Sequence, residues 1–100
     1  MAVTSKALVR TSAATSSATL YTVPSSTTAI ITNIAVVNTA GSAGTFTLLL
    51  DGVDLHTTTA IAANSTIYID LKQVLATTKT ITGFASATTI DFHISGVEIS

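Results

Sequence analysis

The chain has 100 residues, no cysteine and a formal net charge of -1, which limits it to about one domain and excludes disulfides and thiolate metal sites. Charged residues make up 9% of it, against about a quarter in an ordinary soluble domain, so 21 threonines and 11 serines supply most of the polarity. The four basic residues, Lys6, Arg10, Lys72 and Lys79, do not cluster, which excludes the basic surface that nucleic-acid binding requires. We expect a neutral surface that tolerates neighbouring copies.

The N-terminal segment lacks the pattern of a signal peptide. Its basic residues are followed by the small polar residues 11–19, TSAATSSAT, and not by an apolar run. No stretch of 18 apolar residues occurs that would span a membrane. We therefore expect a soluble protein made in a cytoplasm, with residues 1–17 as an N-terminal arm or edge segment and residues 18–100 as a β-sandwich domain.

The first strand pattern, LYTV, ends at Pro24, and the next, AIITNIAVVN over residues 29–38, is the most apolar stretch. Strict alternation divides its side chains into two apolar rows, one with Ile30, Ile34 and Val36 and the other with Ile31, Ala35 and Val37. The pattern predicts a strand covered on both faces.

Two turns follow. Asp51-Gly52, between FTLLL and VDLHTT, is typical of a two-residue type I′ hairpin, and Asn64-Ser65 precedes the strand TIYID, whose Tyr68 we expect on the outside or at an edge. Residues 71–76, LKQVLA, place apolar side chains at helical spacing. This spacing predicts a short crossover there, with one or two helical turns of α or 3₁₀ type.

The last third of the chain is again β-like. Gly83 marks a bulge or a close backbone approach. Ile90, Phe92 and Ile94 share one parity but Val97 and Ile99 have the other, which predicts a bulge at Gly96. Seven or eight short strands with regular turns indicate an all-β fold, a single antiparallel β-sandwich or jelly-roll-like domain.

Several residues could carry chemistry. His56 and His93 each follow an aspartate by two residues, Asp54 and Asp91, which would place each pair on one strand face. Two such pairs could form a metal site, but solvent-facing polar residues are the favoured interpretation. A Ser-His-Asp triad could be assembled from any of the serines, although no GxSxG motif is present.

The carboxylates do not indicate an active site either. Asp51, Asp54, Asp70, Asp91 and Glu98 could supply a glycosidase pair, but the chain has no tryptophan for sugar stacking. The sequon Asn64-Ser65-Thr66 is interpreted as a turn. We therefore expect no catalytic, cofactor-binding or metal-binding residues, no cofactor and no enzymatic activity.

The segments LYTVPSSTTAIITNIAVVNTAGSAGTFTLLLDG, IAANSTIYIDLKQVL and ISGVEI, within residues 18–99, resemble small structural proteins of tailed bacteriophages. The resemblance implies a non-enzymatic part of the virion, with a capsid decoration or cement protein as first choice and a neck, tail or fibre component as the alternative. It further implies a homo-oligomer, with a trimer favoured, bound to the major capsid protein or other virion proteins. The segment before residue 20 would be the natural contact element.

Two other classes compete with this interpretation. A carbohydrate-binding module would show exposed aromatic side chains, for which only Tyr21, Tyr68, Phe46, Phe84 and Phe92 are available, the phenylalanines mostly at inward parity. A small hydrolase would bring Ser, His and Asp within hydrogen-bond reach in a cleft.

Overall fold

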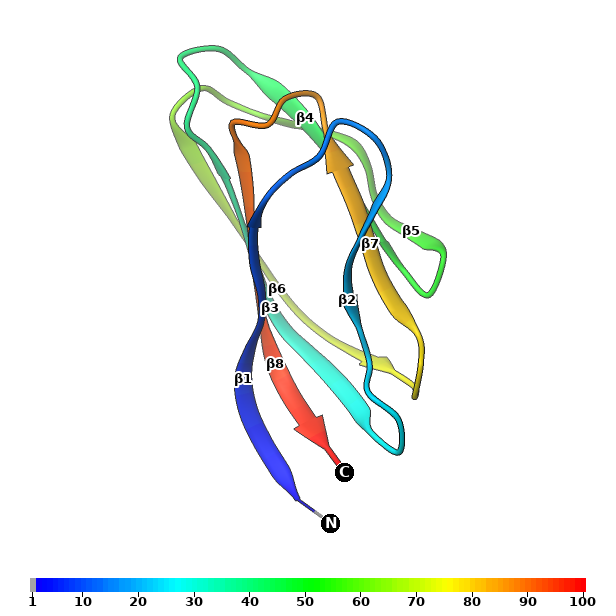
Figure 1. Ribbon diagram of the computed structural model, residues 1–100. Coiled ribbons are helices and arrows are strands. Elements are labelled where there is room, and N and C mark those ends of the chain that lie inside the picture. Colours follow the sequence, from blue (N-terminus) through cyan, green and yellow to red (C-terminus); the bar gives the residue numbers. More distant parts are fainter. Residues whose placement is uncertain (1) are drawn as a thin grey trace.

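The fold is an eight-stranded antiparallel β-sandwich, described for residues 2–100 by a computed structural model. Its two four-stranded sheets have the orders β1-β8-β3-β6 and β2-β7-β4-β5, which is the order of a jelly roll. The sequence predicts the antiparallel β-sandwich or jelly-roll-like class, and this class is confirmed. Both chain ends lie at the same end of the sandwich (Figure 1). The strands are β1 Val3–Ser12, β2 Ala18–Thr22, β3 Thr28–Asn38, β4 Gly44–Leu50, β5 Val53–Ile61, β6 Ser65–Leu75, β7 Thr80–Ala85 and β8 Ile90–Ile99.

The core lies between the two sheets. Both its phenylalanines, Phe46 of β4 and Phe92 of β8, are almost fully buried, and their rings meet edge to face with centroids 6.3 Å apart. Burial of such large apolar side chains stabilises a chain without disulfides. The remaining core is aliphatic, contributed mainly by Ile31, Ile34, Val36, Leu48, Ile81, Ile90 and Ile94.

The predicted crossover at residues 71–76 is wrong, because β6 continues as a strand to Leu75. Odd-numbered residues of β6 face the other sheet and even-numbered residues face outward, and this parity persists across a register shift where Leu71 and Lys72 lie opposite Thr32 of β3. Val74 is one of the outward residues and is 66% exposed. An exposed valine beside two inward leucines therefore produced the helix-like spacing.

The central strand β3 is covered on one face only, which corrects the predicted burial of both. Its alternation breaks at Thr32, where the pairing with β8 passes from Ile31↔Gly96 directly to Asn33↔Ser95. This extra residue in β3 puts Ile31, Ile34 and Val36 together in the core. Ile30 falls instead on the outer face and is half-buried.

The bulge predicted at Gly96 is wrong, because β8 keeps its alternation through Gly96 and leaves Val97 and Ile99 on the outer face. The inserted residues lie in the strands on both sides of it. β3 inserts Thr32, and β1 inserts Leu8 between the pairs Ala7↔Ser95 and Val9↔Ile94. A Cβ atom at residue 96 would lie 2.2 Å from the carbonyl oxygen of Ile30, which is far inside van der Waals contact. Only glycine fits where the bulged neighbour approaches this closely. Gly83 is a second close approach, because a Cβ atom there would lie 2.9 Å from Leu48 Cδ2.

The turns follow their sequence signals. Asp51 and Gly52 have φ values of 54° and 75°, as a type I′ hairpin requires. Asn64 also has a positive φ, 51°, and its N–H donates to the carbonyl of Ala40. The buried Asn38 fastens the neighbouring loop, because its amide donates to Ser42 O at 2.9 Å and Ala62 O at 3.2 Å.

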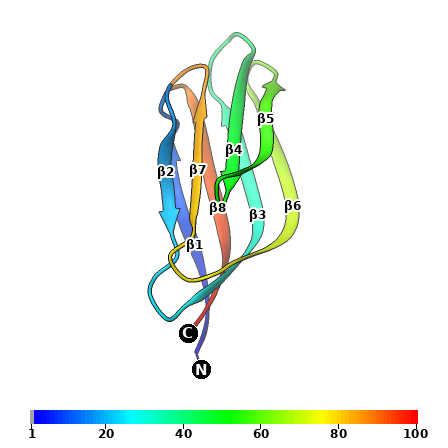
Figure 2. The same cartoon turned by 90° about the vertical axis from the view of Figure 1, so that its right-hand side faces the viewer.

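Residues 3–12 form an edge strand. β1 pairs with β8 from Val3↔Ile99 to Ser12↔Asp91, and Ala13, just beyond it, is buried in the core. Figure 2 shows β1 and β2 along one side of the sandwich and β5 and β6 along the other. The region predicted as an arm or edge segment therefore contributes one strand of the first sheet.

Candidate functional site

The outer face of the sheet β1-β8-β3-β6 carries an unusual apolar row. Register places the outward side chains of Val97, Ile30 and Val74 side by side across β8, β3 and β6. Val3 and Ile99 extend the row toward the chain ends as a cross-strand pair. We call these five residues the apolar strip; its outermost members, Val3 and Val74, are 64% and 66% exposed. Aligned exposed valines are typical of a contact surface.

The other half of the same face is polar. Arg10, His93 and Tyr68 lie in one row across β1, β8 and β6, with Ala35 of β3 between the last two. Asp91 stands one row further along β8. We call Arg10, Tyr68, Asp91 and His93 the polar strip. Tyr68 is 73% exposed, so its ring is a free aromatic platform beside charged and hydrogen-bonding groups.

The outer face of the second sheet differs from both strips because threonine dominates it. Pairing aligns Thr19 of β2 with Thr82 of β7, and Thr22 with Thr80. Threonine suits this position through its β-branched shape and its hydroxyl, which binds water. This face matches the threonine-covered surface expected from composition.

The two Asp/His pairs do not form one site. Asp54 and His56 lie on β5 of one sheet, whereas Asp91 and His93 lie on β8 of the other. The first pair is also divided between faces, because β5 changes register there and the His56 ring packs 5.5 Å from that of Phe46. Within residues 2–100, no three His, Cys, Asp or Glu side chains gather as a metal site would require.

The structure does bring one serine near an Asp/His pair. Ser12, Asp91 and His93 line a shallow depression of about 240 Å³ at the rim of the polar strip, together with Arg10 and Thr11. No hydrogen bond joins the three side chains to one another, so the relay of a hydrolytic triad is not formed among them. The depression offers polar groups for binding a ligand.

The five carboxylates are dispersed. Asp51 lies in the β4–β5 turn, 3.7 Å from Lys79 Nζ, and Asp54 accepts a hydrogen bond from Thr57 Oγ1. Asp70 accepts from Asn33 on the outer face, and Asp91 and Glu98 lie on opposite faces of β8. No pair flanks a cleft in the way that glycoside hydrolysis requires.

Glu98 has a structural role instead. It faces the second sheet, accepts a hydrogen bond from the hydroxyl of Tyr21 and lies 3.3 Å from Lys6 Nζ. The Tyr21 hydrogen bond, supported by Lys6, lowers the pKa of Glu98 despite partial burial. Burial, followed by the hydrogen bond to Glu98, raises the pKa of Tyr21. This contact ties β8 and β1 to β2 near the chain ends.

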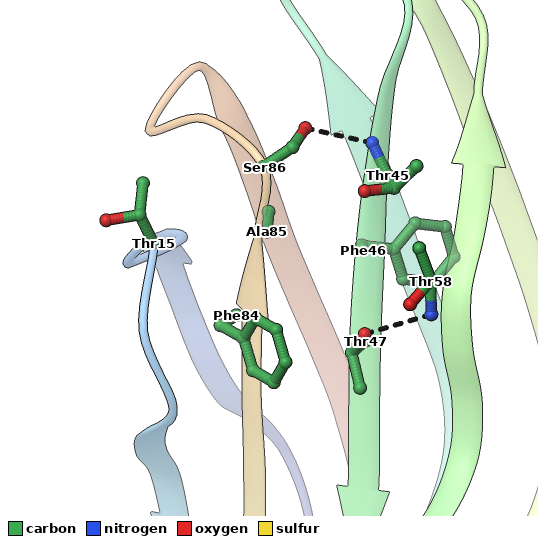
Figure 3. Close-up of a pocket in the computed structure, with 8 residues that line it drawn as sticks. All are labelled: Thr15, Thr45, Phe46, Thr47, Thr58, Phe84, Ala85 and Ser86. Atoms are coloured by element: carbon green, nitrogen blue, oxygen red, sulfur yellow. Dashed lines mark hydrogen bonds between the residues drawn. The ribbon is translucent and has the colours of Figure 1, made fainter.

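A further hollow of about 190 Å³ lies on the threonine-rich sheet (Figure 3). Its lining is neutral: Phe84 faces Thr47 across it, and the backbone N–H groups of Thr45 and Thr58 donate to Ser86 Oγ and Thr47 Oγ1, each at 3.0 Å. These hydroxyls are already engaged, and no titratable group lines the hollow. It therefore lacks the means for acid–base or nucleophilic chemistry.

Sequence reasoning overlooked the apolar strip. The signal was present in Val74 and Val97, apolar residues at the parity opposite to the core residues of their strands, but they were attributed to a helix and to a bulge. The alignment of Val97 and Val74 with Ile30 depends on the inserted Thr32, which no local pattern predicts.

Comparison with known proteins leaves the family of this chain open. No protein-family model matches it, and no curated protein is similar to it in sequence. None of the described residues forms a helix long and apolar enough to cross a bilayer.

Solved structures give distant likenesses of fold. The chain is similar to part of the Agl-KA catalytic domain (11% identity, TM-score 0.44), covering 91% of this chain and 21% of that one. It is also similar to a pentameric capsid protein from metagenomic phage sequences (11%, 0.38), covering 90% and 59%. A third likeness is to the CBM35 module of Paenibacillus barcinonensis (6%, 0.41), covering 98% and 88%. The chain thus spans less than two thirds of the first two proteins.

Proposed function

We propose that this domain is a non-enzymatic structural protein of a phage virion, a decoration protein that binds the capsid surface and stabilises the shell. The observation that carries the proposal is the apolar strip, a row of aligned valine and isoleucine side chains on the outer face of a sheet, of which Val3 and Val74 are exposed and the others half-buried. The family resemblance in residues 18–99 supports the virion as the setting. A neck, tail or fibre position is the alternative within the same class.

The character of the strip favours a protein partner. It is uncharged and lies on the open face of a sheet, so it suits another apolar protein surface and offers nothing to a phosphate backbone. Binding to the assembled shell, and not to free subunits, would stabilise the shell by linkage. The dispersed carboxylates and the unlinked Ser12, Asp91 and His93 support a non-enzymatic role.

The test is retention on capsids. Purified protein is mixed with capsids assembled from the major capsid protein of the same genome, and sedimented protein is quantified. We expect Val97→Lys to abolish cosedimentation, because a charge would be buried in the contact. Thr22→Lys, which adds the same charge to the outer face of the other sheet, should bind normally.

Each result has a separate meaning. Equal binding by the Val97→Lys and wild-type proteins would refute the strip as the capsid contact. Absence of wild-type binding to capsids, with recovery of the protein in a tail or neck fraction, would replace the decoration role by the alternative. Thermal unfolding of both variants confirms that the sandwich is intact.

A carbohydrate-binding role is the second candidate, because Tyr68 is an exposed aromatic side chain beside Arg10 and His93. Sugars stack on such rings and accept hydrogen bonds from such neighbours. A glycan array compares the wild-type protein with Tyr68→Thr. Binding that disappears in the variant would favour this function, whereas an empty array leaves the capsid role as the better candidate.

A further inference from the structure

The four edge strands of the sandwich are not equally protected against pairing with another strand. β2 has five residues and an inserted Leu20, and Pro24 follows two residues later. β5 changes register twice and contains Thr58 at a φ of 44°. β1 contains the inserted Leu8 and two basic residues. Bulges, short length and charge are the devices that prevent edge-to-edge association.

β6 is the longest of the four edge strands, with 11 residues, it is the last strand of its sheet, and no positive φ occurs within it. Its ladder with β3 has one irregularity, where Leu71 and Lys72 lie opposite Thr32. The side chains of β6 keep the same parity on both sides of this irregularity. It also carries two of the large apolar side chains most exposed in the described chain, Tyr68 and Val74. A long and partly apolar edge strand of this kind is a template for a further strand.

We propose that β6 pairs antiparallel with β6 of a second copy about a twofold axis at Leu71, which joins two four-stranded sheets into one of eight strands. In this register Asp70 faces the partner's Lys72, and Tyr68 faces the partner's Val74, all on the outer face. On the inner face Leu71 meets the partner's Leu71. The strand is thus complementary to itself in both charge and hydrophobicity.

The charges select this register over its neighbours. In a strand pair, residues directly opposite each other have side chains on the same face of the sheet. A twofold axis at residue 70 or 72 meets this requirement as well as an axis at residue 71 does. An axis at residue 70 would oppose two copies of Asp70, and an axis at residue 72 would oppose two copies of Lys72. Like charges directly opposite each other destabilise a strand pair, whereas opposite charges stabilise it.

This inference goes beyond the proposed function, because it concerns the contact between copies and not the partner of the apolar strip. It also differs from the trimer that the family resemblance implies. The molar mass in solution separates the two arrangements directly.

The first experiment measures molar mass by light scattering over a concentration series. We expect wild-type dimers, and about a tenfold or greater rise in the dissociation constant for Asp70→Lys, which opposes two lysines twice in each dimer. Exchanging the charges in Asp70→Lys/Lys72→Asp should restore the dimer, because the opposite charges face each other again. A general loss of folding cannot give this rescue.

The second experiment uses the absence of cysteine in the chain. Residue 71 alone meets its own copy, with Cα atoms expected about 4.5–5.5 Å apart, within disulfide range. Oxidation should therefore cross-link Leu71→Cys dimers. The matched control is Gln73→Cys on the same face of β6, whose copies would lie about 14 Å apart along the strands and should stay unlinked.

Three results would overturn the pairing: a wild-type monomer at every concentration, a trimer whose mass Asp70→Lys leaves unchanged, or equal cross-linking of the two cysteine variants. A monomer that still binds capsids would remove this inference and leave the proposed function standing. A β6-linked dimer that binds no capsid would support this inference and contradict the proposed function.

Discussion

The two edge strands of the sheet β1-β8-β3-β6 both contain an irregularity but differ in the side chains that they expose. β1 inserts Leu8 in its ladder with β8, and β6 places two residues opposite Thr32 of β3. β1 exposes one large apolar side chain, Val3, whereas β6 exposes Tyr68 and Val74. Because bulges occur at both edges, the exposed side chains decide the comparison. The difference favours β6 as the edge available for association.

Gly96→Ala should have the largest effect, because it breaks the β1 side at its tightest point. The new methyl group would overlap the Ile30 carbonyl, with a Cβ–O distance of 2.2 Å, and we expect a loss of about 3 kcal/mol in unfolding free energy. Urea denaturation measures it. Gly41→Ala is the control, since no atom lies within 4 Å of its Cβ position. Equal stability of the two variants would contradict the close approach.

Tyr21→Phe should come second, at about 1 kcal/mol, because it removes the hydrogen bond to the Glu98 carboxylate. The stability that the wild-type contact contributes falls at both acidic and alkaline pH. The lowered pKa of Glu98 means that its contribution is complete above the ordinary glutamate value of about 4.3 and is lost as pH falls through the folded-state pKa. The raised pKa of Tyr21 means that its contribution is complete below about pH 10 and is lost as pH rises further.

Thermal unfolding across pH tests this contact. Wild-type protein should lose stability at both acidic and alkaline extremes, and Tyr21→Phe should have the flatter profile in both ranges. Parallel profiles for the two proteins would show that the contact does not govern the pH dependence.

Tyr68→Thr addresses the β6 side and should cost the monomer about 0.5 kcal/mol or less, because the ring is largely exposed and threonine suits a strand. Its effect on association should be larger, since Tyr68 faces the partner's Val74 in the proposed pair. Urea denaturation at low concentration and light scattering at high concentration separate the two quantities. If Tyr68→Thr unfolded at a much lower urea concentration than the wild type yet associated normally, Tyr68 would stabilise the monomer and not the contact between copies.

Lys6→Ala should have the smallest effect, about 0.3 kcal/mol, because Lys6 is half-exposed and surface ion pairs contribute little. Comparison with Tyr21→Phe shows whether the tyrosine or the lysine carries the contact with Glu98. A larger loss for Lys6→Ala would assign that role to the lysine.

The sequence predicted the parts of the fold that depend on local chemistry. Asp51-Gly52 adopts positive φ because its residue types tolerate it, and Phe46 and Phe92 are buried because alternation placed them inward. Seven or eight strands with regular turns were enough to indicate an antiparallel β-sandwich or jelly-roll-like domain. The bulge predicted at Gly96 was wrong, because β8 is regular there and the inserted residues lie in the neighbouring strands β1 and β3.

Local chemistry could not predict which face of a sheet each side chain lies on or which strands lie at the sheet edges. Whether Ile30 lies inside or outside depends on the insertion of Thr32, and whether Val74 is exposed depends on β6 lying at the end of its sheet. Both are relations between strands far apart in the chain. The helix-like spacing of residues 71–76 was misleading for this reason.

The sequence by itself determined the class of fold, the turn positions and the neutral, threonine-rich surface, because each follows from residue type and short-range period. Tertiary structure alone decided which apolar residues form the apolar strip and which edge stays open. Those features arise from strand order and register, and a shift of one residue moves every side chain of a strand to the other face.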